Sequence, residues 1–281
     1  MRNVSDIIFI GPQVVLKTTV RNPDRHSAMS SSLPPRGETY VSLDDVRKIC
    51  NECQNSVIMD TNESKRLFNE IKDYFRDLNL SVEQDIPVSF VERTTLNNSI
   101  KGLKENGQMT ECVGMCYTGF IHSPECPGTC FSDVPPIKNI YRGTTTLTEQ
   151  IVPLTTESTC EGTVKKINIL RGLTRIETLA TLAHELMHAW FWLNGFRRIR
   201  GPVEEGVCEV IAYLWVASEI VTSRLSPYEM KLGEFYRFQM EENQAEIYGD
   251  GFRAAYAAVL KHGLRPVIDH IRKTGELPDV P

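Results

Sequence analysis

The feature that most constrains this chain is a pair of short polar motifs inside two apolar, helix-forming segments. His184 and His188 belong to the first motif, HELMH, and Glu205 and Glu209 belong to the second, EEGVCE. Residues four apart share one face of a helix, so each motif presents two polar side chains together. Buried histidines and carboxylates are costly unless they are paired or bound to a metal. The chain is therefore expected to fold so that these two helices meet.

Apolar spacing predicts the first helix over residues 174–193, with Gly195 as a stop signal just beyond it. A short loop follows, and Gly201 and Pro202 open the second helical segment, VEEGVCEVIAYLWVASEIV. Proline suits the first turn of a helix, where its missing N–H has no partner to lose. A helix hairpin with merely solvated polar residues is the alternative, but the first segment is apolar nearly all round.

Two histidines on one helical face, with a carboxylate from a second helix, are a ligand set of catalytic zinc sites. We expect His184, His188 and Glu205 to hold Zn²⁺. Glu185 is then the general base, which takes a proton from zinc-bound water and passes it to the leaving nitrogen. The motifs predict metal-assisted peptide hydrolysis.

Two neighbouring carboxylates need separate assignments. Glu209 stands one turn beyond Glu205 and is expected to hydrogen-bond a zinc-bound imidazole, that of His184. Glu204 is the competing third ligand, and only one of two adjacent helical residues can face the metal. The oxyanion donor is left open among several residues of suitable chemistry: Tyr213, Tyr248, Arg253 and His262.

Several stretches also carry a family resemblance: LAHELMHAWFWLNGF, VEEGVCEVIAYLW, KLGEFYRFQ and IYGDGFRAAYAAVLKHGLRPVIDHIRKTGELP. Upstream, RKICNECQNSVIMDT and IPVSFVERTTLN extend it. Together they resemble the C-terminal peptidase region of the plant DA-one family, the LIM-domain, ubiquitin-activated peptidases that restrict organ growth. The likeness runs from about residue 39 to the C-terminus and is weak across 104–160.

The resemblance implies a zinc metallopeptidase that makes limited cuts in ubiquitin-pathway and growth-regulating proteins, with E3 ubiquitin ligases among its substrates. Family members usually carry ubiquitin-interacting helices and a full LIM domain in front of this region, and neither is found in this sequence. The sequence therefore leaves open whether ubiquitin is a partner. The rival interpretation is a non-catalytic interaction protein that keeps the zincin fold.

The expected fold class is α+β: a zincin-like peptidase domain over 61–281, a partial LIM-like remnant over 39–60 and a flexible segment over 1–38 rich in Ser, Pro and charge. Strands are expected at 39–43, 88–92, 145–152 and 164–170, and further helices at 63–77, 227–240, 251–261 and 264–274. The strand at 164–170 leads into the active-site helix and is expected to bind extended substrate by strand addition.

Eight cysteines in a chain without a convincing signal peptide are more typical of thiols or metal ligands than of disulfides. Cys50 and Cys53 have zinc-ribbon spacing, but the second pair that the family places about two dozen residues earlier is missing. A Gly- and Pro-rich stretch, predicted as a loop, holds more thiols and one imidazole that could bind a structural zinc: Cys112, Cys116, His122, Cys126 and Cys130. Cys160 and Cys208 are expected to be buried small residues.

The net charge of −5 offers no basic field, which argues against a nucleic-acid partner. No stretch reaches the eighteen or more apolar residues of a membrane span. The apolar stretch at 7–20 is interrupted by Gly11-Pro12 and Lys17 and lacks a cleavage site, so it is a poor signal peptide. We expect an intracellular, cytoplasmic protein, with the nucleus as the alternative compartment.

Overall fold

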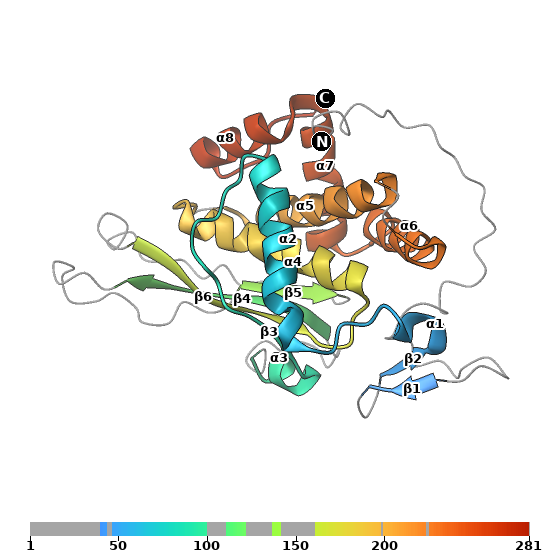
Figure 1. Ribbon diagram of the computed structural model, residues 1–281. Coiled ribbons are helices and arrows are strands. Elements are labelled where there is room, and N and C mark those ends of the chain that lie inside the picture. The colour runs from blue at the N-terminus through green and yellow to red at the C-terminus, as the bar shows by residue number, and fades with distance from the viewer. Residues whose placement is uncertain are drawn as a thin grey trace.

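The computed structural model describes residues 40–43, 47–99, 111–121, 137–141, 161–197, 199–222 and 225–280. These residues form a mixed α+β fold, as the sequence predicts. A four-stranded sheet carries helices α2, α4 and α5 on one side, and α7 and α8 lie farther from the sheet (Figure 1). The two helices that carry the polar motifs are thus central in the molecule.

The sheet has the strand order β3, β6, β4, β5. Its strands are β3 (Val88–Val91), β6 (Glu161–Leu170), β4 (Glu111–Ile121) and β5 (Ile137–Tyr141). The β3–β6 pair is parallel, whereas β4 runs antiparallel to both β6 and β5. Helix α4 packs on β6 and β4, so these two strands support the polar motif on α4.

Helix α4 (Arg175–Leu193) begins with a capping box. The backbone N–H of Thr174 donates to the Glu177 carboxylate at 3.0 Å, and the Thr174 hydroxyl accepts from the Glu177 N–H. Almost every residue from Ile176 to Trp192 is buried, because α4 is enclosed by the sheet and other helices. The all-round apolar character of this segment thus reflects a central helix.

Helix α5 (Gly201–Val221) has Pro202 in its first turn, as its sequence predicts. It packs against α4 and also against the start of α7. A β-carbon at Gly206 would stand 2.3 Å from the carbonyl oxygen of Gly251, so the absence of a side chain permits this close approach.

The remaining helices complete the core around α4 and α5. They are α2 (Ser64–Asp77), α3 (Arg93–Ser99), α6 (Pro227–Glu241), the π-helical turn η5 (Glu246–Asp250), α7 (Gly251–His262) and α8 (Leu264–Thr274). Helix α2 is amphipathic, with Leu67, Phe68 and Ile71 fully or almost fully buried. The Tyr74 hydroxyl donates to the Ile211 carbonyl at 3.0 Å and ties α2 to α5.

The N-terminal segment consists of β1 (Tyr40–Ser42), β2 (Lys48–Cys50), α1 (Asn51–Gln54) and the 3-10 turn η3 (Thr61–Glu63). It binds the turn just before α4. The Ile58 N–H donates to the Leu173 carbonyl at 2.9 Å, and the Gly172 N–H donates to the Ile58 carbonyl at 3.0 Å. The segment that the sequence marks as a LIM-like remnant therefore supports the start of the motif-bearing helix.

Arg47 is a second link between this segment and the same turn. Its guanidinium is only 2% exposed and donates to the Arg171 carbonyl at 2.9 Å. Cys53 joins the segment to α6 instead, because its sulfur lies 2.7 Å from the Tyr228 hydroxyl.

Two sequence-based expectations are wrong. Residues 111–121, predicted as part of a Gly- and Pro-rich loop, form strand β4, because alternate apolar side chains such as Val113 and Met115 are buried while the backbone pairs with β6. Strand β6 lies inside the sheet with partners on both sides. Residues 167–169 of β6 pair with β3 on one side and with β4 on the other, so this part of the strand cannot accept a substrate strand.

The other expected elements agree with the structure to within a few residues, except the strand at 145–152, which lies outside the described residues. Among the helices that the structure describes, none is both long enough and apolar enough to cross a membrane.

We predict that Arg47→Met lowers the free energy of unfolding by about 1–3 kcal/mol, because the part-buried Arg171 carbonyl loses the guanidinium donor. Urea denaturation measures the change. Arg76→Met is the control, since the Arg76–Asp73 pair is exposed and such pairs contribute about 0–1 kcal/mol. Equal stabilities of the two variants would show that the Arg47 contact does not hold the segment in place.

Candidate metal centre

Helix α4 presents His184 and His188 one turn apart, and α5 faces them with carboxylates and a thiol. His184 is 1% exposed and His188 is 0% exposed. Glu205, Glu209 and Cys208 of α5 are also buried. The packing of the two helices thus collects ionisable groups from distant parts of the chain in one water-poor site.

Three electron-pair donors converge at the centre of this site. The Nε2 atoms of His184 and His188 are 3.1 Å apart. The Oε2 atom of Glu205 lies 3.1 Å from Nε2 of His184 and 3.4 Å from Nε2 of His188. Donors around a tetrahedral zinc ion, with bonds of about 2.0–2.1 Å, stand about 3.3 Å apart. The spacing of the three atoms therefore fits a metal of this size.

The opposite ring nitrogens face carboxylates. Nδ1 of His184 lies 3.0 Å from Oε2 of Glu209, and Nδ1 of His188 lies 2.9 Å from Oε1 of Glu204. A carboxylate can only accept, so each Nδ1 carries the proton and donates it. In the neutral imidazoles, both Nε2 atoms then keep a free lone pair that points to the centre.

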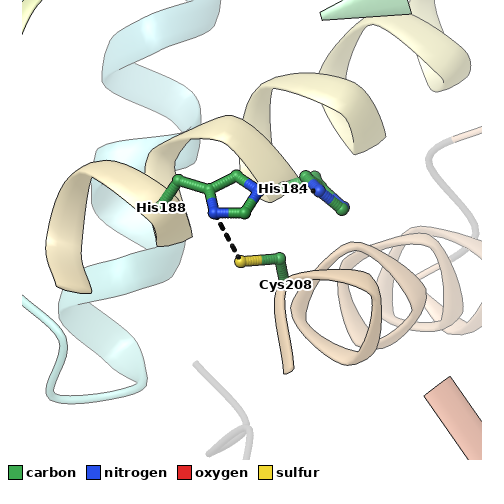
Figure 2. Close-up of side chains that lie close together, drawn as sticks. All are labelled: His184, His188 and Cys208. Carbon is green, nitrogen blue, oxygen red and sulfur yellow. Dashed lines mark hydrogen bonds between the residues drawn. The ribbon is translucent and has the colours of Figure 1, made fainter. Parts of the chain in front are cut away.

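Cys208 lies on the other side of His188. Its sulfur stands 3.5 Å from Nδ1 of His188 (Figure 2). The carboxylate of Glu204 accepts a hydrogen bond from the same nitrogen. His184, His188 and Cys208 form a buried group whose donor atoms are close enough to hold a metal ion. Burial raises the pKa of the Cys208 thiol to about 12. Its sulfur faces Nδ1 of His188, whereas Oε2 of Glu205 faces the Nε2 atoms of both histidines, and this geometry favours Glu205 as the third ligand.

The carboxylate and the imidazoles at the centre each stabilise the charged form of the other. Burial alone would raise the pKa of the Glu205 carboxyl, but the two imidazoles outweigh it and lower this pKa to about 2. Burial also disfavours a charged His184, yet its hydrogen bonds with Glu205 and Glu209 outweigh that effect and raise the pKa of His184 to about 9. The metal-free site therefore holds protons where a cation would stand.

Glu185 differs from the other acids of the site. It is 0% exposed, and no hydrogen bond of ordinary geometry reaches either carboxylate oxygen among the described residues, although the backbone of Cys116 lies close enough to lower its pKa. Burial nevertheless raises the pKa of the Glu185 carboxyl to about 7, and His188 and His184 only partly offset this rise. A buried carboxylate held this weakly is unusual, and a metal-bound water would supply a further donor.

The other predicted ligands are only partly described. Cys126 and Cys130, like His122 and Cys160, lie outside the described residues, and the side chains of Cys50 and Cys112 are not described. Cys53 contacts Tyr228, and Cys116 of β4 is buried close to Glu185, which sequence reasoning did not foresee. Burial raises the pKa of the Cys116 thiol well above its usual value. A second zinc site stays a prediction.

Most oxyanion candidates have partners elsewhere. The Tyr213 hydroxyl donates to Glu241 at 2.6 Å. Arg253 donates to the Asn243 carbonyl at 2.8 Å, and His262 contacts the Asp279 carbonyl at 3.3 Å. Tyr248 is buried in η5, which packs on α5. None of these contacts joins a candidate to the centre, so the oxyanion donor stays open.

Comparison with known families gives the context of this site. The family model described as DA1-like, Protein DA1, matches residues 77–227 and 222–274, which include both polar motifs. The chain belongs to the DA1-like family. This is the plant DA-one family that its motifs resemble. No solved structure matches this DA1-like chain.

Its relatives are about twice as long. The DA1-like chain is 38% identical to Protein DA1-related 1 of Arabidopsis thaliana, with 88% of this chain and 47% of the relative covered. It is 37% identical to LIM domain-containing protein HDR3 of Oryza sativa subsp. japonica, with 88% of this chain and 52% of the relative covered. Protein DA1 of Arabidopsis thaliana is also 37% identical to it, with 88% of this chain and 48% of the relative covered. The chain therefore spans about half the length of the curated relatives it matches.

Sequence reasoning missed the hydrogen bond of Glu204, and the contact changes one expectation. From sequence, Glu204→Ala should keep near-normal metal. Because Glu204 orients His188, we now predict that Glu204→Ala and Glu209→Ala each weaken zinc binding about 10- to 100-fold, whereas Glu205→Ala largely empties the site. Titration with a zinc chelator measures each affinity. Wild-type zinc affinity in Glu204→Ala would show that the contact of Glu204 does not orient His188.

Cys208→Ala separates the two possible third ligands. We expect it to keep zinc within a few-fold of wild type, because Glu205 already completes the set and the Cys208 sulfur faces Nδ1 of His188 rather than the Nε2 atoms. Elemental analysis of the purified variants gives the metal content. Zinc-free Cys208→Ala beside zinc-loaded Glu205→Ala would assign the third ligand to the thiol instead.

We expect zinc binding to release protons and to tighten as pH rises. Zinc takes neutral imidazole, and His184 is mostly protonated below its pKa of about 9. Between pH 7 and 9 the apparent affinity should rise about tenfold per pH unit for each displaced proton, and it should level off above that range. Calorimetric titrations in buffers of different ionisation enthalpy count the protons. An affinity that does not change with pH would contradict a protonated metal-free site.

Proposed function

We propose that this chain is a zinc-dependent metallopeptidase that makes limited cuts in protein substrates. The observation that carries the proposal is the convergence of two imidazole nitrogens and one carboxylate oxygen within 3.1–3.4 Å of one another. Three lone-pair donors this close repel one another unless protons or a metal cation lie between them. The hydrogen bonds at both Nδ1 atoms leave these lone pairs free for a metal.

The chemistry of the donors favours zinc over harder cations. Two imidazoles and one carboxylate suit Zn²⁺, whereas Mg²⁺ and Ca²⁺ prefer oxygen ligands throughout. Three protein ligands leave one position for water, as in catalytic rather than structural zinc sites. When bound, the ion would supply a Lewis acid and a water of lowered pKa.

The side chains then have distinct roles. His184, His188 and Glu205 hold the ion, and Glu209 and Glu204 orient the two imidazoles. Glu185 takes the proton of the attacking water and returns it to the leaving nitrogen. Burial places the pKa of its carboxyl at about 7, close to the working pH, where a group can both accept and donate a proton.

The resemblance of the motifs to the plant DA-one family supports a proposal for the substrate class. We infer that growth regulators and components of the ubiquitin pathway, E3 ubiquitin ligases among them, are cut at few positions. Such partners place the activity inside the cell, in the cytoplasm or nucleus. Ubiquitin is a candidate activator, because the DA-one family that the motifs resemble is ubiquitin-activated.

The proposal predicts that the purified chain, loaded with zinc, cuts a tagged E3 ubiquitin ligase at neutral pH into a few fragments. Glu185→Gln should lower the rate at least about 100-fold, since it removes the proton acceptor while keeping the shape and the metal ligands. The assay is run with and without ubiquitin and with ubiquitylated chain, and metal content is measured for both proteins.

Two outcomes separate the competing functions. Fragments that form with wild type and fail to form with the zinc-loaded variant support the peptidase. A zinc-loaded wild type that binds the ligase and leaves it intact under every activation condition contradicts the peptidase and favours a non-catalytic interaction protein.

A further inference from the structure

Strand β4 approaches the candidate general base at a single glycine. A β-carbon at Gly114 would stand 2.5 Å from Oε1 and 3.0 Å from Cδ of Glu185. It would also stand 2.7 Å from Cγ2 of Thr181, which lies one turn earlier on α4. Side-chain atoms of two α4 residues thus fill the space in which any other residue would place its side chain.

The backbone conformation does not explain this glycine. Positive φ angles occur at Gly172, Gly195, Gly263 and Gly275 among the described glycines, and Gly114 is not one of them. Any residue could adopt its backbone angles, so the reason for glycine here is space.

The strand is also shaped for this approach. Its register with β5 shifts between Cys112 and Gly114, which leaves Val113 without a partner, while Gly114 itself pairs with Ile169 of β6. Such a bulge bends a strand locally and occurs often beside active sites. The bulge directly precedes the residue that meets Glu185.

We propose that Gly114 is a positioning residue of the peptidase. Its missing side chain leaves the space in which the Glu185 carboxylate stands beside His184 and His188. The carboxylate is the movable end of a flexible side chain and lies against the strand. Among the described residues no hydrogen bond of ordinary geometry holds it, and the backbone of Cys116 on the same strand lies close. A side chain at position 114 displaces the carboxylate and leaves the metal ligands in place. This inference rests on the proposed peptidase function.

The test compares Gly114→Ala with Gly119→Ala on the same strand. A β-carbon at Gly119 would meet only the Lys165 side chain, with Cε at 2.8 Å, and the flexible end of that side chain can move away. Clearing the contact at Gly114 moves the Glu185 carboxylate by about 1 Å, which corresponds to a loss of about 100-fold in kcat. We expect unchanged KM and zinc content in Gly114→Ala, wild-type kinetics in Gly119→Ala, and a displaced carboxylate in a crystal structure of Gly114→Ala.

A second variant separates positioning from folding. In Gly114→Ala with Thr181→Ser, the close contact with Cγ2 is gone and the close contact with the Glu185 carboxylate is kept. We expect this double variant to bind zinc and melt like Thr181→Ser alone and still to lose about 100-fold in kcat. Recovery of wild-type kcat in the double variant, or loss of zinc binding in both Gly114 variants, would overturn the proposal, because Gly114 would then serve the fold.

The inference and the proposed function fail in different ways. A zinc-loaded wild type without Glu185-dependent cleavage contradicts the peptidase, and the crystal structure of Gly114→Ala still decides whether the carboxylate moves. An active wild type with equal kcat in Gly114→Ala and Gly119→Ala contradicts only the positioning role.

Discussion

The packing of α4 against α5 is the contact on which the candidate site depends. Each helix alone offers one half of a donor set, and neither half would be stable when buried without the other. Together they place Nε2 of His184 and of His188 within 3.4 Å of a Glu205 oxygen. The geometry of the site therefore follows from how closely and in what register these two helices pack. The approach of α7 to Gly206 helps to hold α5 in that position.

The surroundings of α4 are arranged to hold it still. Its first turn is closed by the Thr174–Glu177 capping box, and residues 56–58 of the N-terminal segment bind the turn that precedes it. On its sheet side, β4 lies against Glu185 without an intervening side chain. A helix buried on nearly all sides cannot rotate without disturbing several neighbours, so its polar motif keeps one orientation.

The elements that sequence placed well are those with strong local signals. Helix α4 has apolar residues on every side and a capping box, α5 has a proline in its first turn, and α7 and α8 were placed to within a residue. The local sequence predicts a loop at strand β4, because the glycines in this segment are typical of turns. Its strand conformation comes from pairing with β6, a contact with a segment about fifty residues away.

The sequence by itself determined which residues can form the candidate site. The spacing of His184, Glu185 and His188 on one helix and of Glu205 and Glu209 on the next follows from helical periodicity, which is local. Only the tertiary structure decided which nitrogen faces which oxygen, that Glu204 and Cys208 meet the same side of His188, and that Gly114 stands against Glu185. These contacts join distant segments, and their distances depend on the packing of whole helices and strands, which local periodicity does not encode.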